Sequence, residues 1–225
     1  MKLALIGGEI ITPFRIVKNG TIVMQDGQIS DIGKASDVRI PDECEVIDVS
    51  GNIVTPGFVD LLVHGGGGKG FADEDPASIG IVADYFIRHG STTVLASLYA
   101  KPKDQLLADL RRIADYIHAN PDSNIIGIHM EGPYLNPVLK GAMNEEYLWT
   151  PSVESWDEMW EASRGLIKIM TIAPELEGSL QVMRAAALKG VVLSIGHSTA
   201  NYETIELAID HGAAHVTHMF NAMTP

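Results

Sequence analysis

Short apolar runs separated by turn residues make up roughly the first 53 residues of the chain. Each run has the length and β-branched content of a strand, and Gly-containing pairs stand between the runs. Asn19-Gly20 and Asp26-Gly27 are predicted to form tight hairpin turns. The strands are too few and too short to close a core alone, so residues 1–53 are predicted to form a small β domain that packs on other structure. Its strands are expected at 3–5, 9–12, 20–25 and 29–32.

From residue 54 onward the pattern changes to apolar strands that alternate with amphipathic helices. Nearly continuous apolar strands of this kind form a parallel sheet that is covered on both faces. The alternation allows a doubly wound open sheet or a (β/α)8 barrel of which residues 54–225 supply about six of the eight units. Strands are expected at 57–63, 92–97, 124–130, 166–172, 191–195 and 214–220, and helices beginning near 76, 103, 150, 179 and 201.

Composition narrows the class of protein and its partners. A formal charge of −13 argues against binding to nucleic acid or to an anionic membrane surface. Cys44 is the only cysteine, so no internal disulfide is possible. No apolar run approaches the roughly 18 residues of a membrane span, and the apolar run at the amino terminus is too short for a signal peptide. We therefore expect a cytoplasmic protein whose partner is a small molecule.

Polar side chains follow four of the predicted strands at the point where each strand ends. These side chains are His64, Glu131, His197 and His218. In both candidate architectures the carboxyl ends of the strands carry the active site. The chemistry of the protein is therefore expected at this edge of the sheet.

Glu131, His197 and His218 together predict a metal site. Two imidazoles and one carboxylate suit Zn²⁺, and Fe²⁺ nearly as well, and three protein ligands leave one position open for water. Each histidine taken alone is also typical of a hydrogen-bonded residue at a strand end. His129 is expected to lie either behind the ligands or inside a barrel, and His215 on the opposite face of its strand from the groups that point into the site.

Several motifs resemble the amidohydrolase superfamily, and specifically the N-acetylglucosamine-6-phosphate deacetylase family. The most specific are His129-Met-Glu-Gly-Pro-Tyr-Leu-Asn136 and Thr217-His-Met-Phe-Asn-Ala-Met223. Segments that are shared more widely are Asp26-Gly-Gln-Ile-Ser-Asp-Ile-Gly33, Thr55-Pro-Gly-Phe-Val-Asp60 and Ile195-Gly-His-Ser198. The match extends over the whole chain.

The resemblance implies a metal-dependent (β/α)8 barrel with a small β-sandwich segment at the amino terminus, and a homodimer. It implies hydrolysis of the acetamide of N-acetylglucosamine 6-phosphate to glucosamine 6-phosphate and acetate. Glu131, His197 and His218 are the implied metal ligands, and one Zn or Fe ion per chain is expected. Ala142, Met143, Asn221 and Ala222 are the implied substrate contacts.

The sequence also departs from the family pattern. Leu62-Val-His64 stands in place of the His-x-His pair of the first barrel strand, so His64 and His129 are candidates for a second metal or for a position behind the ligands. Met143 stands where the family usually has a histidine, and its side chain cannot donate a hydrogen bond. The resemblance places the catalytic aspartate of the family beyond Pro225, so we expect no catalytic acid or base within this chain and poor hydrolysis by it alone.

Two other functions fit the same residues. One is a non-catalytic relative that binds a sugar phosphate or a metal ion, which Met143 favours. The other is a different amidohydrolase that acts on a cyclic amide. A carbamylated lysine is expected near the position of Glu131 in many such enzymes, so Glu131 with Gly132-Pro133 argues against this second alternative.

Overall fold

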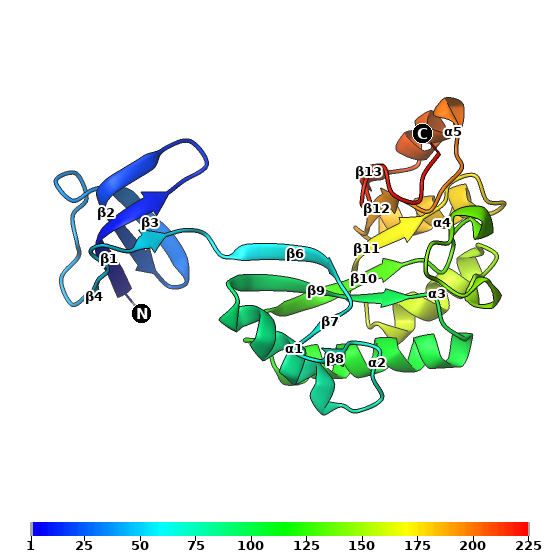
Figure 1. Cartoon of the computed structure of the whole chain (residues 1–225), viewed down its shortest axis with the longest axis horizontal. Helices are drawn as coiled ribbons and strands as arrows, with labels where there is room; N and C mark the ends of the chain where they lie inside the picture. The colour runs from blue at the N-terminus through cyan, green and yellow to red at the C-terminus, as the bar shows by residue number, and fades with distance from the viewer. Residues whose placement is uncertain (1, 225) are drawn as a thin grey trace. The chain divides into compact units, whose positions relative to one another are not determined.

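The computed structural model describes residues 2–224 of the chain. The chain divides into two compact units, one up to Gly57 and one from Phe58 onward. Figure 1 labels most of the elements of each unit.

The first unit is a single five-stranded sheet in the order β3-β2-β1-β4, with β5 also paired to β1. β1 is antiparallel to β2 and parallel to β4 and β5. No second sheet that would complete a sandwich occurs among the residues described in this unit. The strands are β1 (Lys2–Ile11), β2 (Ile16–Gln25), β3 (Gln28–Lys34), β4 (Glu45–Asp48) and β5 (Ile53–Val54).

One of the two predicted hairpin turns of this unit is present. Asp26 and Gly27 join β2 to β3 with φ angles of 52° and 78°, the left-handed conformation that a tight turn of this type requires. The prediction for Asn19-Gly20 was wrong. Asn19 lies inside β2 with φ 47°, where the pairing with β1 shifts register, so it forms a bulge. A Cβ on Gly20 would lie 2.3 Å from the Ile10 side chain, so close packing selects this glycine.

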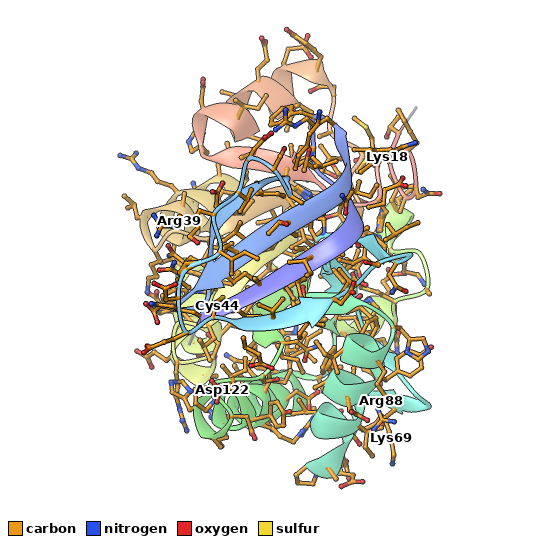
Figure 2. All side chains as sticks on the ribbon, turned by 90° about the vertical axis from the view of Figure 1, so that its left-hand side faces the viewer. Lys18, Arg39, Cys44, Lys69, Arg88 and Asp122 are labelled. Atoms are coloured by element: carbon orange, nitrogen blue, oxygen red, sulfur yellow. The ribbon has the colours of Figure 1, made fainter. Side chains whose placement is uncertain are left out.

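Small apolar clusters stabilise this unit. Ala4, Val23 and Val38 are buried together, and Cys44 packs against them from a half-buried position. Cys44 is labelled among the side chains of Figure 2. The thiol lies 3.6 Å from the Glu45 carbonyl. Because Cys44 packs against the apolar cluster, its role in the first unit is structural.

The second unit is a parallel sheet of six strands in the order β13-β12-β11-β10-β9-β6. Neighbouring strands follow one another in the chain, and the strand order has no reversal of the kind that defines a doubly wound sheet. The barrel architecture is therefore confirmed, as a six-stranded half-barrel that fans from β6 to β13 (Figure 1). The strands are β6 (Phe58–Val63), β9 (Ser91–Tyr99), β10 (Ile125–Glu131), β11 (Ile167–Ile172), β12 (Val192–Ile195) and β13 (Ala213–Val216).

A helix follows each of the first five strands of this sheet, and the core lies between the helices and the sheet. Its largest buried side chains include Trp156, Leu110 and Ile128. No helix within residues 2–224 is both long and apolar enough to cross a bilayer. The helices are α1 (Ala77–Arg88), α2 (Lys103–Ala119), α3 (Val153–Ala162), α4 (Ser179–Leu188) and α5 (Tyr202–Asp210).

Shorter elements lie in the connections after β6 and β10. β7 (Gly65–Gly66) and β8 (Lys69–Gly70) form a small hairpin, and η1 (Pro137–Leu139) and η2 (Glu145–Tyr147) are single turns of 3-10 helix. The predicted last strand, 214–220, was too long. β13 ends at Val216, because His218, Phe220 and Ala222 all adopt positive φ angles and turn the chain back.

Candidate metal centre

Three strand ends of the second unit bring Glu131, His197 and His218 together. Glu131 is the last residue of β10, whereas His197 and His218 follow β12 and β13. Oε1 of Glu131 lies 3.2 Å from Nε2 of His197 and 3.1 Å from Nε2 of His218. The two Nε2 atoms are 3.1 Å apart. One potential ligand atom from each residue thus points at the same small volume.

Both histidines sit in an uncommon backbone conformation. His197 has φ 51° and His218 has φ 30°, in or near the left-handed region that a side chain with a Cβ adopts at a cost of roughly 1–2 kcal/mol. The surrounding backbone holds them there: Asn136 N–H donates to the His197 carbonyl at 3.0 Å, and Asn221 N–H donates to the His218 carbonyl at 2.9 Å. Strain that is held in this way is typical of functional sites.

The hydrogen bonds of the two rings fix which nitrogen carries the hydrogen. Nδ1 of His197 lies 2.8 Å from the Leu139 carbonyl, and Nδ1 of His218 lies 3.1 Å from the Asn221 carbonyl. A carbonyl oxygen only accepts, so each Nδ1 donates, and the neutral ring leaves a lone pair on Nε2. Two lone pairs and the Glu131 carboxylate then face one another, an arrangement that is favourable only when positive charge lies among them.

A divalent cation fits this group of atoms. Tetrahedral zinc with bonds of about 2.0–2.1 Å separates its ligands by roughly 3.3 Å. The three separations observed here are 3.1–3.2 Å, and the donor set of two imidazoles and a carboxylate is one that Zn²⁺ and Fe²⁺ accept. The Nδ1 bonds to backbone carbonyls are the contacts that orient ligating imidazoles in metal proteins.

The titration of the site residues also indicates a preference for positive charge. Burial by itself would raise the pKa of the Glu131 carboxyl, but the hydrogen bonds that His197 and His64 donate from Nε2 when their rings are protonated outweigh burial and hold that pKa well below its ordinary range. Burial would lower the pKa of His197, and the bond to Glu131 reverses this and raises it. The site therefore holds its carboxylate ionised and attracts a proton or a cation to His197.

His64 lies on the other side of the same carboxylate. Its Nε2 is 3.0 Å from Oε2 of Glu131, and its Nδ1 is 3.1 Å from the Ser97 carbonyl. The hydrogen bond to Glu131 raises the pKa of this imidazole. His64 thus contacts the oxygen that the other two histidines leave free, and its ring packs edge-on against Tyr99.

His129 does not join the cluster of ligand atoms. Its ring is buried, with Nδ1 2.6 Å from the Leu61 carbonyl and Nε2 2.8 Å from Oγ1 of Thr171. Burial lowers the pKa of His129 to about 4, so the ring is neutral. Of the two positions that the sequence allowed, His129 takes the one in the interior of the half-barrel.

A pocket of about 540 Å³ opens beside Glu131 and His197. Ala142 and Met143, two of the predicted substrate contacts, line it together with His64. Tyr99, Ala100, Asn144 and Tyr147 also line it, and sequence reasoning missed them because no local pattern marks a side chain that a loop carries into a pocket. Met143 is buried against Ala100 and Leu135, so its side chain is part of an apolar wall.

Asn221 and Ala222 are not among the residues that line this pocket. Both belong to the turn after His218, and the Ala222 carbonyl accepts a hydrogen bond from Ser198 N–H at 3.2 Å. The Asn221 side chain lies 3.3 Å from the His218 carbonyl. In this structure these two residues shape the loop that carries His218.

Glu175 is a further residue that the sequence did not reveal. Its carboxylate accepts hydrogen bonds from Asn136, Ser198 and Thr199 at 2.6–3.1 Å. Burial would raise the pKa of this carboxyl, but these donors lower it below its ordinary value. The contacts join the loops after β10, β11 and β12, and so fix the segment that begins at His197.

Known proteins resemble the chain in both sequence and structure, although no family model matches it. The chain is 33% identical over 226 residues to N-acetylglucosamine-6-phosphate deacetylase of Rattus norvegicus, and 29% identical over 220 residues to that of Bacillus subtilis. These matches cover 95% and 96% of the chain.

A solved structure of the Mycobacterium smegmatis N-acetyl-D-glucosamine-6-phosphate deacetylase, a variant in complex with N-acetyl-D-glucosamine-6-phosphate, superposes with a TM-score of 0.87 at 30% identity. This match covers 100% of the chain and 57% of the other protein. The chain is a homologue of the N-acetylglucosamine-6-phosphate deacetylases at about 30% identity. It spans about 55% of the length of the curated deacetylases and corresponds to their amino-terminal portion.

Proposed function

We propose that Glu131, His197 and His218 bind one divalent metal ion, and that the protein to which this chain belongs hydrolyses the acetamide of N-acetylglucosamine 6-phosphate. The observation that carries the proposal is the set of three ligand atoms with separations of 3.1–3.2 Å and no protein cation among them. Homology to the deacetylases supports the substrate. Because the chain spans about 55% of its relatives, the activity is proposed for the whole protein.

Each residue of the site has a distinct task in this proposal. A bound metal ion supplies a coordinated water whose pKa is lowered toward neutrality. Glu131 contributes the negative charge that retains the ion, and the Nδ1–H groups of His197 and His218 keep both Nε2 lone pairs aimed at it. His64, whose Nδ1 faces the Ser97 carbonyl, donates from Nε2 to the second oxygen of Glu131 when its ring is protonated, which fixes the plane of the carboxylate.

The pocket beside the site suits an acetamido sugar. A volume of about 540 Å³ accommodates a monosaccharide, and the apolar wall of Ala100 and Met143 offers a surface for a methyl group. Met143 donates no hydrogen bond, and both ring nitrogens of His64 are already engaged with Glu131 and the Ser97 carbonyl, so neither side chain offers a free donor to a carbonyl oxygen in this pocket.

The direct test is acetate release from N-acetylglucosamine 6-phosphate by the protein loaded with Zn²⁺ or Fe²⁺. We expect turnover that a chelator abolishes and that the metal restores. The variant Glu131→Gln should lose both the metal and the activity, and Glu146→Gln, an exposed carboxylate on η2, should behave like the unaltered protein. Metal-dependent turnover of cyclic amides without acetate release would overturn the assignment.

A second function, binding of the sugar phosphate without hydrolysis, is favoured by one observation. The apolar wall at Met143 places no donor where one is needed to stabilise an oxyanion. Calorimetric binding of N-acetylglucosamine 6-phosphate to the metal-loaded protein, with no acetate formed, would support this alternative. The variant Met143→His, which introduces a donor, should then gain acetate release.

We also propose a cytoplasmic homodimer with one zinc or ferrous ion per chain, as the family resemblance implies. Light scattering of the purified protein would give the oligomeric state, and metal analysis would identify the ion. A monomer, or two ions per chain, would overturn the corresponding part of this proposal.

A further inference from the structure

A continuous chain of hydrogen-bonded side chains crosses the interior of the half-barrel behind the three ligands. Nε2 of His129 lies 2.8 Å from Oγ1 of Thr171, which lies 2.7 Å from Oγ1 of Thr217. Thr217 Oγ1 lies 2.6 Å from Ser194 Oγ, and Ser194 Oγ lies 2.9 Å from Nδ1 of His215. This series of hydrogen bonds thus links β10, β11, β12 and β13 through side chains alone.

The direction of every hydrogen bond in this chain follows from its first member. Nδ1 of His129 faces the Leu61 carbonyl at 2.6 Å and must donate to it, so Nε2 of the neutral ring accepts from the Thr171 hydroxyl. Thr171 then accepts from Thr217, and Thr217 accepts from Ser194. Each hydroxyl both donates and accepts, so the removal of one leaves two partners unsatisfied.

His215 is the last member of this series of hydrogen bonds, and its position corrects the sequence-based prediction. His215 was expected on the face of its strand that points away from the site. Its ring instead contacts Ser194, whose hydroxyl bonds to Thr217 inside the half-barrel. Ser194 and His215 pair across the β12–β13 ladder, so their side chains share the face that points into the half-barrel.

The hydroxyls lie next to the ligands along each strand. Thr171 pairs with Glu131 across the β10–β11 ladder, and Thr217 immediately precedes His218. A Cβ on Gly196, the residue before His197, would lie 2.8 Å from the Thr171 side chain and 2.9 Å from that of Thr217. Both histidine ligands therefore start from backbone that packs directly on these two threonines.

The backbone alone holds β13 weakly. It pairs with β12 at three positions, with a register shift between the first and the second, and the ladder ends at Val216. His218 lies two residues further on, in a strained conformation. Beyond Val216, the contacts of Thr217 are the last before the ligand: its N–H donates to the Ile195 carbonyl at 2.9 Å, and its buried hydroxyl bonds to Thr171 and Ser194.

We propose that Thr171, Ser194 and Thr217 are positioning residues that hold β12 and β13, and with them His197 and His218, at the separation from Glu131 at which a metal ion binds. The inference rests on the metal site of the proposed function. It adds residues that do not contact the ion, and one of them, Thr171, lies on a strand that carries no ligand.

Thr171→Val gives the sharpest test, because valine keeps the shape of the side chain and removes two hydrogen bonds of the chain. We expect its zinc affinity, measured by competition with a chelator, to fall about 10–100-fold, as for the loss of other partners that orient ligands. The absorption spectrum of the Co²⁺-loaded variant should also change, since the spectrum reports ligand geometry. Thr171→Ser, which restores the hydroxyl, should return the affinity to within about 3-fold of the original.

Ser179→Ala is the matched control. Its hydroxyl is also fully buried in the second unit and donates to the Ala173 carbonyl at 2.7 Å, and Ala173 lies after β11 rather than on a strand that carries a ligand. Ser179→Ala should lose about as much unfolding free energy as Thr171→Val, but it should keep its zinc affinity. Thr171→Val with unchanged zinc affinity and Co²⁺ spectrum would overturn the positioning role alone. If the unaltered protein bound no zinc, the metal site and the positioning role would both be overturned.

Discussion

Two buried carboxylates of the second unit, Asp109 and Glu131, differ in where their positive charge comes from. Asp109, on α2, lies 2.7 Å from Nζ of Lys101 and 2.6 Å from a guanidinium nitrogen of Arg112. Glu131 has only histidines around it, and all three of their rings have already committed Nδ1 to backbone carbonyls. Both carboxylates are at least 94% buried, with exposures of 3% and 6%.

The difference separates a structural charge from a functional one. The two cations beside Asp109 also donate to the Phe71 and Ala72 carbonyls, so this network fastens the loop before α1 to α2. The positive charge that Asp109 needs therefore comes from Lys101 and Arg112 themselves. The group around Glu131 is incomplete, since three acceptors converge without a permanent cation. A metal ion is the partner that such a group lacks.

The largest effect is expected from the loss of a ligand. His218→Asn removes Nε2 from the cluster, so zinc affinity should fall more than about 100-fold, beyond the effect of residues that only orient ligands. His218 is half-buried and lies after the end of β13, so the unfolding free energy without metal should change by less than about 1 kcal/mol. Chelator competition and chemical denaturation measure the two quantities. Retained zinc affinity would remove His218 from the site.

The opposite result is expected for Asp109→Asn. Loss of this charge leaves Lys101 and Arg112 without their partner, which should lower the unfolding free energy by about 2 kcal/mol, less than for a fully buried pair because water reaches both cations. Zinc affinity should stay the same. If Asp109→Asn lost zinc affinity in proportion to its loss of unfolding free energy, Asp109 and Glu131 would not differ as a structural and a functional charge.

A smaller effect on the unfolding free energy is expected for Glu131→Gln in the absence of metal. The amide of glutamine can donate to the lone pairs of His197 and His218, which the carboxylate cannot do. The variant in turn loses the bonds that protonated His197 and His64 donate to the carboxylate, so the metal-free variant should stay within about 1 kcal/mol of the unaltered protein. Thermal unfolding in the presence of chelator gives the comparison. A large loss of stability would mean that Glu131 has a structural role like that of Asp109.

Glu175 lies between Asp109 and Glu131 in this comparison, because its carboxylate accepts hydrogen bonds from neutral donors alone. Glu175→Gln should cost about 1 kcal/mol near neutral pH. The folded-state pKa of this carboxyl is lowered from 4.5, so its contribution is present above that value and is lost as the pH falls through the folded-state pKa. The difference in unfolding free energy between the two proteins should therefore shrink below about pH 4.5. A difference that grows on acidification would contradict this sign.

The order and type of elements in the second unit could be predicted from the sequence because helical spacing and apolar strands repeat there without interruption. The candidate ligands could be found because they follow strand ends. The bulge at Asn19 and the early end of β13 could not, because local propensity does not report the register of a neighbouring strand. The bonds of Thr171 and Glu175 were missed for a related reason: they join strands and loops far apart in the sequence.

Titration of the metal-free protein with Zn²⁺, alongside Glu131→Gln, tests the central claim most directly. We expect one ion to bind per chain with high affinity, and binding to weaken more than about 100-fold in the variant while the variant remains folded. Equal zinc binding by the two proteins, or no binding by either, would contradict the claim that Glu131, His197 and His218 form a cation site.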